Sequence, residues 1–213
     1  VKLVKNKDNN LNSEIQSYLN LNKNVSNNNN QVVSSGISDK KNSKNIFSSD
    51  KVHCDSCLEK HHKKSGTTSY HHQMLGAVLI HPDQQNVIPL CPEPIIRQDG
   101  QKKNDCERNA CRRILEKIRQ DHPRLGLVIT EDGLASNAPH IRDLKRLDMS
   151  FILGAKPGDH KFLFEEYATS GSRCKQATQV AGEIVHVFNY VNDLQLNEKN
   201  EDVRVNFLNY EER

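Results

Sequence analysis

Two groups of side chains in this 213-residue chain have the types and spacing that bind metal ions. The first is the acid pair Glu131–Asp132, which ends the apolar run LGLVIT and precedes Gly133. The second lies in the segment HCDSCLEKHH, and its candidate ligands are Cys54, Cys57, His61 and His62. Carboxylates suit Mg²⁺ or Mn²⁺, whereas thiolates and imidazoles suit Zn²⁺. The chain therefore offers two candidate sites of different chemistry.

The acid pair stands where α/β proteins bind ligands. A short apolar run bounded by turn residues is typical of a buried strand, and the carboxyl end of such a strand is the ligand-binding edge of an open α/β sheet. Adjacent strand residues point to opposite faces, so Asp132 is the candidate and Glu131 has no predicted role. The alternative is that Asp132 only caps the turn, which is the simpler interpretation of an isolated acid.

The Cys-x2-Cys pair predicts one edge of a tetrahedral zinc site. His61 and His62 would complete four ligands, but they follow the cysteines unusually closely, because structural zinc modules place the second pair a dozen or more residues away. His71 and His72 are the alternative distant pair. A reduced cysteine pair without a metal is the remaining interpretation.

Composition limits the remaining possibilities. The net charge of +3 is compatible with a polyanionic partner, and an apolar content of 35% is low for a fully packed chain. Residues 1–45 are rich in Asn, Lys and Ser, so we expect them to be disordered, with a basic arm on nucleic acid as the alternative. No apolar run is long enough to span a bilayer, and the six scattered cysteines favour a reducing compartment. We therefore expect a cytoplasmic protein without a membrane partner.

Hydrophobic periodicity predicts an α/β fold. The pattern indicates a hairpin over 74–88, helices over 104–122, 140–147 and 159–168, strands at 125–131 and 150–154, and two β-like runs at 182–191 and 202–210. The helix at 104–122 should bury a stripe of Cys106, Ala110, Ile114 and Ile118, and the segment 91–103 should be a loop. Strand, helix and strand with short connections imply a parallel βαβ unit.

Five segments in order resemble the central part of bacterial insertion-sequence transposases of the DDE class, which have a ribonuclease-H-like catalytic core. They are YHHQMLGAVLIHPD, VIPLCPEPIIRQDG, KNDCERNACRRILEKIR, VITEDGLASNAPHI and FILGAKPGDHKFLF. The resemblance covers roughly residues 47–210. It implies a partial ribonuclease-H-like fold, a mixed sheet with flanking helices, followed by a β-rich C-terminal insertion. The tail that composition predicts to be disordered precedes this fold. The implied segments are 1–45 (tail), 46–68 (zinc segment), 69–168 (core) and 169–213 (truncated β-rich insertion).

The resemblance also implies a chemistry. In this class three carboxylates hold two Mg²⁺ or Mn²⁺ ions that cleave and join DNA at transposon ends. Asp132 falls at the second Asp of the class, so the resemblance makes it a catalytic residue and metal ligand. Lys156 resembles a basic residue near the core, where it could contact a DNA phosphate. A homodimer and a nucleoid-associated location go with an active member of the class.

Two of the three acids do not match. Counting back along the resemblance places Asn42 at the first Asp, while the nearby Asp39 and Asp50 each need a register shift. The third acid, a Glu on a helix, should lie beyond Arg213. We therefore expect a truncated transposase that is inactive by itself. The alternatives are a zinc-stabilised DNA-binding module without catalysis, and a metal-dependent nuclease that uses Asp132 with Asp39 or Asp50.

Overall fold

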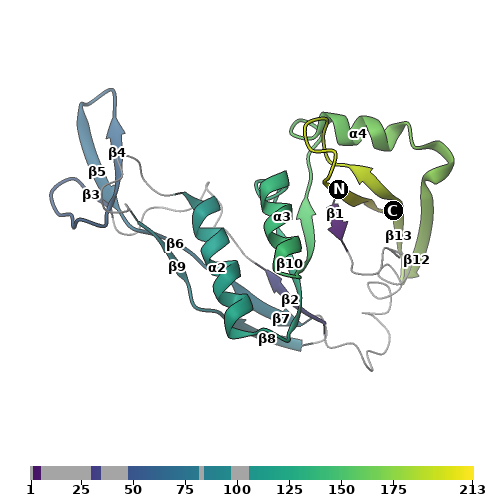
Figure 1. Ribbon diagram of the computed structural model, residues 1–213, viewed down its shortest axis with the longest axis horizontal. Coiled ribbons are helices and arrows are strands. Elements are labelled where there is room, and N and C mark those ends of the chain that lie inside the picture. Colours follow the sequence, from purple (N-terminus) through teal and green to yellow (C-terminus); the bar gives the residue numbers. More distant parts are fainter. Residues whose placement is uncertain (1, 6–29, 35–47, 82–83, 97–105) are drawn as a thin grey trace. The chain divides into compact units, whose positions relative to one another are not determined.

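The computed structural model describes residues 2–5, 30–34, 48–81, 84–96 and 106–213 (Figure 1). Contacts within the chain divide it into two compact units. Unit 1 comprises residues 1–34, 80–87 and 124–213, and unit 2 comprises residues 35–79 and 88–123. Both mix helices or turns with strands, so the predicted α/β class is confirmed at this level. No helix in the described ranges is both long and apolar enough to cross a membrane.

The main sheet has nine strands in the order β12-β13-β14-β1-β11-β10-β2-β7-β8. Their bounds are β1 Lys2–Lys5, β2 Asn30–Ser34, β7 Val78–His81, β8 Gln84–Pro89, β10 Gly126–Glu131, β11 Ser150–Gly154, β12 Lys175–Ala181, β13 Ile184–Gln195 and β14 Arg204–Glu212. The predicted hairpin is present as the neighbouring strands β7 and β8.

Three neighbouring strands of this sheet run parallel. β10 pairs in parallel with β2 on one side, where Val128 lies opposite Val32, and with β11 on the other, where Ile129 lies opposite Phe151. Leu127 and Ile129 are 3% and 0% exposed, as expected of a strand covered on its apolar face. The carboxyl ends of β2, β10 and β11 therefore lie along the same edge of the sheet.

Helix α3 (Ala138–Arg146) connects β10 to β11 and confirms the predicted βαβ unit. Asn137 caps it, because its side-chain oxygen accepts the His140 N–H at 3.1 Å, and Pro139 lies in the first turn, where no backbone donor is needed. Ala138, Ile141 and Leu144 form its buried face. The cap fixes where the helix begins, so the turn after β10 is confined to six residues.

The C-terminal strands extend the same sheet. β12, β13 and β14 pair antiparallel, and β14 pairs antiparallel with β1, which in turn pairs with β11. Helix α4 (Lys161–Ala168) contacts β13. Phe207 of β14 is 0% exposed, stacks on Tyr167 with ring centroids 4.2 Å apart, and meets Phe164 edge-on at 5.2 Å. These aromatic contacts attach α4 to the sheet.

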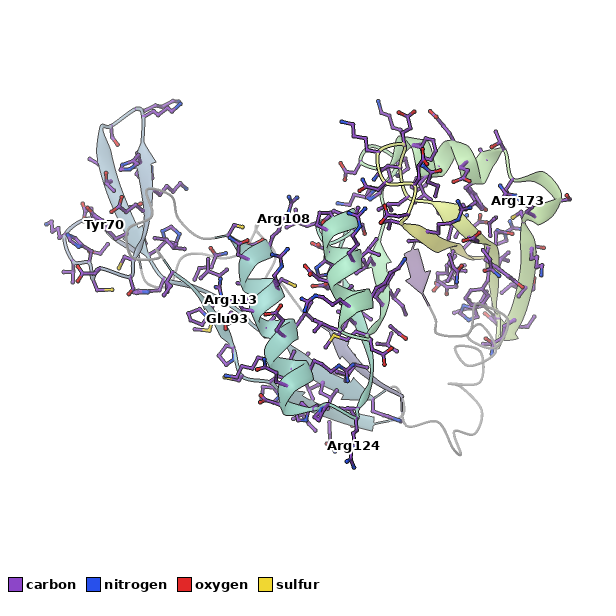
Figure 2. All side chains as sticks on the ribbon, viewed as in Figure 1. Tyr70, Glu93, Arg108, Arg113, Arg124 and Arg173 are labelled. Atoms are coloured by element: carbon purple, nitrogen blue, oxygen red, sulfur yellow. The ribbon has the colours of Figure 1, made fainter. Side chains whose placement is uncertain are left out.

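The described residues of unit 2 form two small sheets and one helix. β3 (Ser48–Ser49), β5 (Thr67–His71) and β4 (Leu58–His62) form a three-stranded sheet in that order, and β6 (Gln73–Leu75) pairs with β9 (Glu93–Ile95). Helix α2 (Glu107–Asp121) packs on β9 and β6, and its buried residues are Ala110, Cys111, Ile114, Leu115 and Ile118. Arg113 of α2 ties the helix to β9 through an ion pair with Glu93 at 2.5 Å (Figure 2).

Several expectations need correction. The predicted disorder of residues 1–45 is wrong for β1 and β2, because each lies between two other strands and obtains backbone hydrogen bonds on both sides, whatever its composition. The predicted loop at 91–103 contains β9, and Cys106 is an exposed N-cap instead of a core residue. The division into units also differs from the boundaries 45, 68 and 168, since α2 belongs with β6 and β9 while β12–β14 share the sheet of β10.

The aromatic attachment of α4 gives a first prediction. Phe207→Ala removes a fully buried ring between Tyr167 and Phe164, and we expect the free energy of unfolding to fall by about 3–5 kcal/mol. Val180→Ala, at a side chain that is 69% exposed on β12, is the control and should cost less than about 1 kcal/mol. Urea denaturation followed by circular dichroism measures both. Equal losses in the two variants would contradict this account of the core.

Candidate functional sites

Asp132 directly follows β10 at the carboxyl edge of the parallel strands, as predicted. Its side chain is exposed, and its Oδ1 accepts the N–H of Leu134 at 2.9 Å. The carbonyl oxygen of Asp132 accepts the N–H of Ala135 at 3.2 Å. These two bonds form the turn that leads to α3, so Asp132 does cap this turn. A carboxylate at this edge can also bind a metal ion if other ligands lie close to it.

The turn that carries Asp132 is packed tightly against the end of β11. A Cβ added to Gly154 would lie 3.1 Å from the backbone nitrogen of Gly133 and 3.3 Å from the carbonyl carbon of Asp132. The Ser136 hydroxyl donates to the Gly154 carbonyl, and His160 Nε2 lies 2.6 Å from the Ser136 carbonyl oxygen. A Cβ at position 154 would press on this backbone, so Gly154 favours the close approach of the turn that carries Asp132.

Lys156 and Glu131 flank this turn in different ways. A Cβ added to Gly133 would lie 3.8 Å from Cε of Lys156, so this exposed lysine extends over the residue next to Asp132. Glu131 instead bonds the imidazole of His140 on α3, and the side chains of that pair are only 5% and 11% exposed. Glu131 therefore pairs with a side chain of α3, whereas Lys156 lies over the turn itself.

The described residues do not fit a two-metal site at Asp132. Among them, no group of three His, Cys, Asp or Glu side chains within ligating distance includes Asp132. β2, the parallel neighbour of β10, has the sequence NQVVS and offers no carboxylate. Asp39 and Asn42 lie outside the described residues, and Asp50 belongs to unit 2. Two Mg²⁺ ions need several oxygen ligands, so one exposed carboxylate cannot hold them.

In unit 2 the structure brings Cys54, Cys57 and His72 together. The two sulfurs are 3.5 Å apart, and Nε2 of His72 lies 3.5 Å from Sγ of Cys54 and 3.3 Å from Sγ of Cys57. The three side chains form a group that could hold a metal ion. The predicted cysteine ligands are therefore adjacent, and His72, one of the alternative distant pair, joins them.

The prediction that His61 and His62 complete the metal site needs correction. Both lie on β4 and bond across to β5, where Nδ1 of His61 is 2.8 Å from the Thr68 hydroxyl and Nε2 of His62 is 2.9 Å from the Ser69 hydroxyl. Neighbouring strand residues point to opposite faces, so the two imidazoles cannot converge on one ion. The same pairing of β4 with β5 explains why His72 lies beside the cysteines. Leu58 lies opposite His71 in the antiparallel register, which brings Cys57 beside His72.

Two ionisable groups near this cluster are perturbed. The backbone N–H of Cys54 lowers the pKa of the Cys57 thiol. Burial and the neighbouring Cys54 thiol together raise this pKa by more, so it lies above its usual value. Burial, followed by the positive charge of Lys60 and the neighbouring imidazole of His72, lowers the pKa of His71. Nδ1 of His71 is also buried without a hydrogen-bond partner. His71, at the end of β5, is therefore harder to protonate than an imidazole in water.

The close approach at Gly154 leads to a second prediction, for which Gly158 is a matched control. Gly154→Ala forces a methyl group against backbone atoms, and overpacking of this kind costs about 1–3 kcal/mol. Gly158→Ala meets nothing within 4 Å and should be neutral or slightly stabilising. Thermal and urea denaturation of both variants measure the difference. A Gly154→Ala variant as stable as the wild type would show that the turn can move away from β11.

Comparisons of the chain with protein-family models, with curated proteins and with solved structures gave no match. The assignment of a function therefore depends on the order of the strands, on the position of Asp132, and on the thiolate–imidazole group. The first two observations concern the main sheet and the third concerns unit 2, so the two candidate sites can be tested separately.

Proposed function

We propose that this chain is related to the DDE-class transposases, that its partner is DNA, and that it does not cleave DNA by itself. The strand arrangement supports this. The run β8-β7-β2-β10-β11 contains the parallel strands β2, β10 and β11, and β2 supplies the strand that a ribonuclease-H-like sheet has before its hairpin. Asp132 directly follows β10, the position of the second Asp of the class. A homodimer and a cytoplasmic, nucleoid-associated location belong to the same proposal.

In this proposal, Asp132 would bind a metal ion only together with other carboxylates. By itself it offers two oxygens, and one of them already accepts the N–H of Leu134. Mg²⁺ keeps most of its water unless several carboxylates converge, so its binding to Asp132 would be weak. We therefore assign no step of DNA cleavage to the described residues, and we expect the chain to bind DNA without cleaving it.

Incubation with DNA tests this directly, and Asp132→Asn is the key variant. The change removes the charge but keeps an oxygen that can accept the Leu134 N–H. We expect no Mg²⁺- or Mn²⁺-dependent cleavage of plasmid or linear DNA by the wild type or by the variant.

Asp148→Asn is the matched control, because Asp148 precedes β11 at the opposite edge of the sheet and Asn tolerates its positive φ of 52°. Cleavage that is lost in Asp132→Asn and kept in Asp148→Asn would replace the proposal with the nuclease alternative. Cleavage that survives both changes would come from elsewhere and would also contradict it.

DNA binding gives a separate prediction. Lys156 is exposed beside the Asp132 turn, where a phosphate contact would position DNA at the carboxyl edge of the sheet. Lys156→Ala should weaken binding to duplex DNA and reduce the salt-dependence slope by about 1. Lys175→Ala, at an exposed lysine on β12, changes the charge equally and should leave the slope unchanged. Fluorescence anisotropy at several salt concentrations measures both. An absence of salt-dependent binding by the wild type would refute a DNA partner.

A metal-stabilised DNA-binding module without catalysis is the second candidate function. The group of Cys54, Cys57 and His72 favours it, because soft ligands of this kind hold structural metals in small DNA-binding modules. The two candidates differ in what DNA binding depends on. If the chain is a metal-stabilised module, removal of the metal with a chelator abolishes DNA binding. If it is a transposase-related chain, the Lys156→Ala change weakens DNA binding instead.

A further inference from the structure

Cys54, Cys57 and His72 have the geometry of one face of a tetrahedral zinc site. With Zn–S bonds of about 2.3 Å and a Zn–N bond of about 2.0 Å, tetrahedral angles require an S···S distance of about 3.8 Å and S···N distances of about 3.5 Å. The observed S···S distance is 3.5 Å, and the S···N distances are 3.5 and 3.3 Å. All six cysteines are free, so the short S···S distance is not a disulfide.

The backbone around the cysteines supports bound thiolates. The N–H of Cys57 donates to the carbonyl of Cys54 at 3.1 Å, closing a turn that brings the two sulfurs to the same side. The N–H of Cys54 donates to Sγ of Cys57 at 3.3 Å, a contact that stabilises negative charge on that sulfur. Cys57 is 5% exposed and Cys54 is exposed, so a metal here would have one protected side and one side open to solvent.

Three nearby histidines, His53, His61 and His62, make their contacts elsewhere. His61 and His62 bond Thr68 and Ser69 across the β4–β5 hairpin, and His53 stacks on Tyr70 with ring centroids 4.2 Å apart. Figure 2 labels Tyr70 in this part of unit 2. The ligand set is therefore selective: it includes the residue that follows β5 and excludes residues within β4.

We propose that Cys54, Cys57 and His72 bind one zinc ion, with solvent in the fourth position, and that this ion holds the start of β4 to the end of β5. Thiolate and imidazole ligands exclude Mg²⁺ and Ca²⁺ and favour Zn²⁺. Among the described His, Cys, Asp and Glu residues, no fourth ligand atom joins this group, which leaves one position for water. The zinc site does not depend on the DNA partner proposed above, so either can fail without the other.

The ion has a structural consequence. Backbone pairing holds the β3-β5-β4 sheet, whereas the Cys54–Cys57 turn is joined to His72 through contacts between sulfur and nitrogen that a metal would strengthen. Metal–ligand bonds made only in the folded state add their binding free energy to folding. A chelator should therefore lower the melting temperature of the wild type.

The test is the metal content of the full chain purified under reducing conditions with Zn²⁺ supplied. We expect one equivalent of zinc by elemental analysis. After exchange with Co²⁺, we expect the sulfur-to-cobalt charge-transfer absorption of a thiolate site. Cys54→Ser, Cys57→Ser and His72→Ala should each lose the stoichiometric metal. His61→Ala and His62→Ala, which alter the ligands expected from spacing alone, should keep it.

His72→Cys separates loss of a ligand from loss of the fold. It replaces the imidazole with a third thiolate, so it should restore metal binding and strengthen the charge-transfer absorption relative to the wild type. Three outcomes would overturn the proposal: a wild type that binds no zinc, a His72→Ala variant that keeps its metal, or a His61→Ala or His62→Ala variant that loses it. A chelator that leaves the melting temperature unchanged would overturn the stabilising role.

Discussion

The parallel pairing of β10 with β2 and β11 is the constraint on which the proposed DNA-related site depends. It places the ends of three strands along one edge, and Asp132 follows the middle one. The contact between Gly154 and the backbone of Asp132 and Gly133 then fixes the turn at that edge. A side chain at position 154 or a shift in register would move the carboxylate, whereas changes elsewhere on the sheet would leave it in place.

Local patterns were enough to predict the elements around this edge. The positions of β10, α3, β11 and α4 agree with the expected runs to within a few residues, because each has its own apolar periodicity and its own capping or turn residues. Asn137 and Pro139 mark the start of α3 in the sequence as clearly as in the structure. The apolar run LGLVIT and the turn residues after it placed Asp132 at the end of its strand, and the structure agrees on that position.

Long-range pairing explains what the sequence could not predict. β1 and β2 lie in a tail rich in Asn, Lys and Ser, and they become strands because their backbones fill positions between other strands. β12, in a polar stretch, is a strand because it pairs along its length with β13. His72 was only an alternative ligand, because a contact set by hairpin register cannot be read from spacing to Cys57. The rule of alternate faces, applied to β4, would have excluded His61 and His62 as a pair.

The two candidate sites cannot replace one another chemically. Thiolates and an imidazole hold a borderline-soft ion in a fixed geometry, whereas transfer of a phosphoryl group needs hard ions held by several carboxylates. A zinc ion on Cys54, Cys57 and His72 would therefore stabilise unit 2 without supplying the ions that Asp132 lacks. Zinc content and Mg²⁺-dependent cleavage are consequently independent observables. A chain that contains zinc but does not cleave DNA is the combination that both proposals require, and cleavage without zinc would refute both.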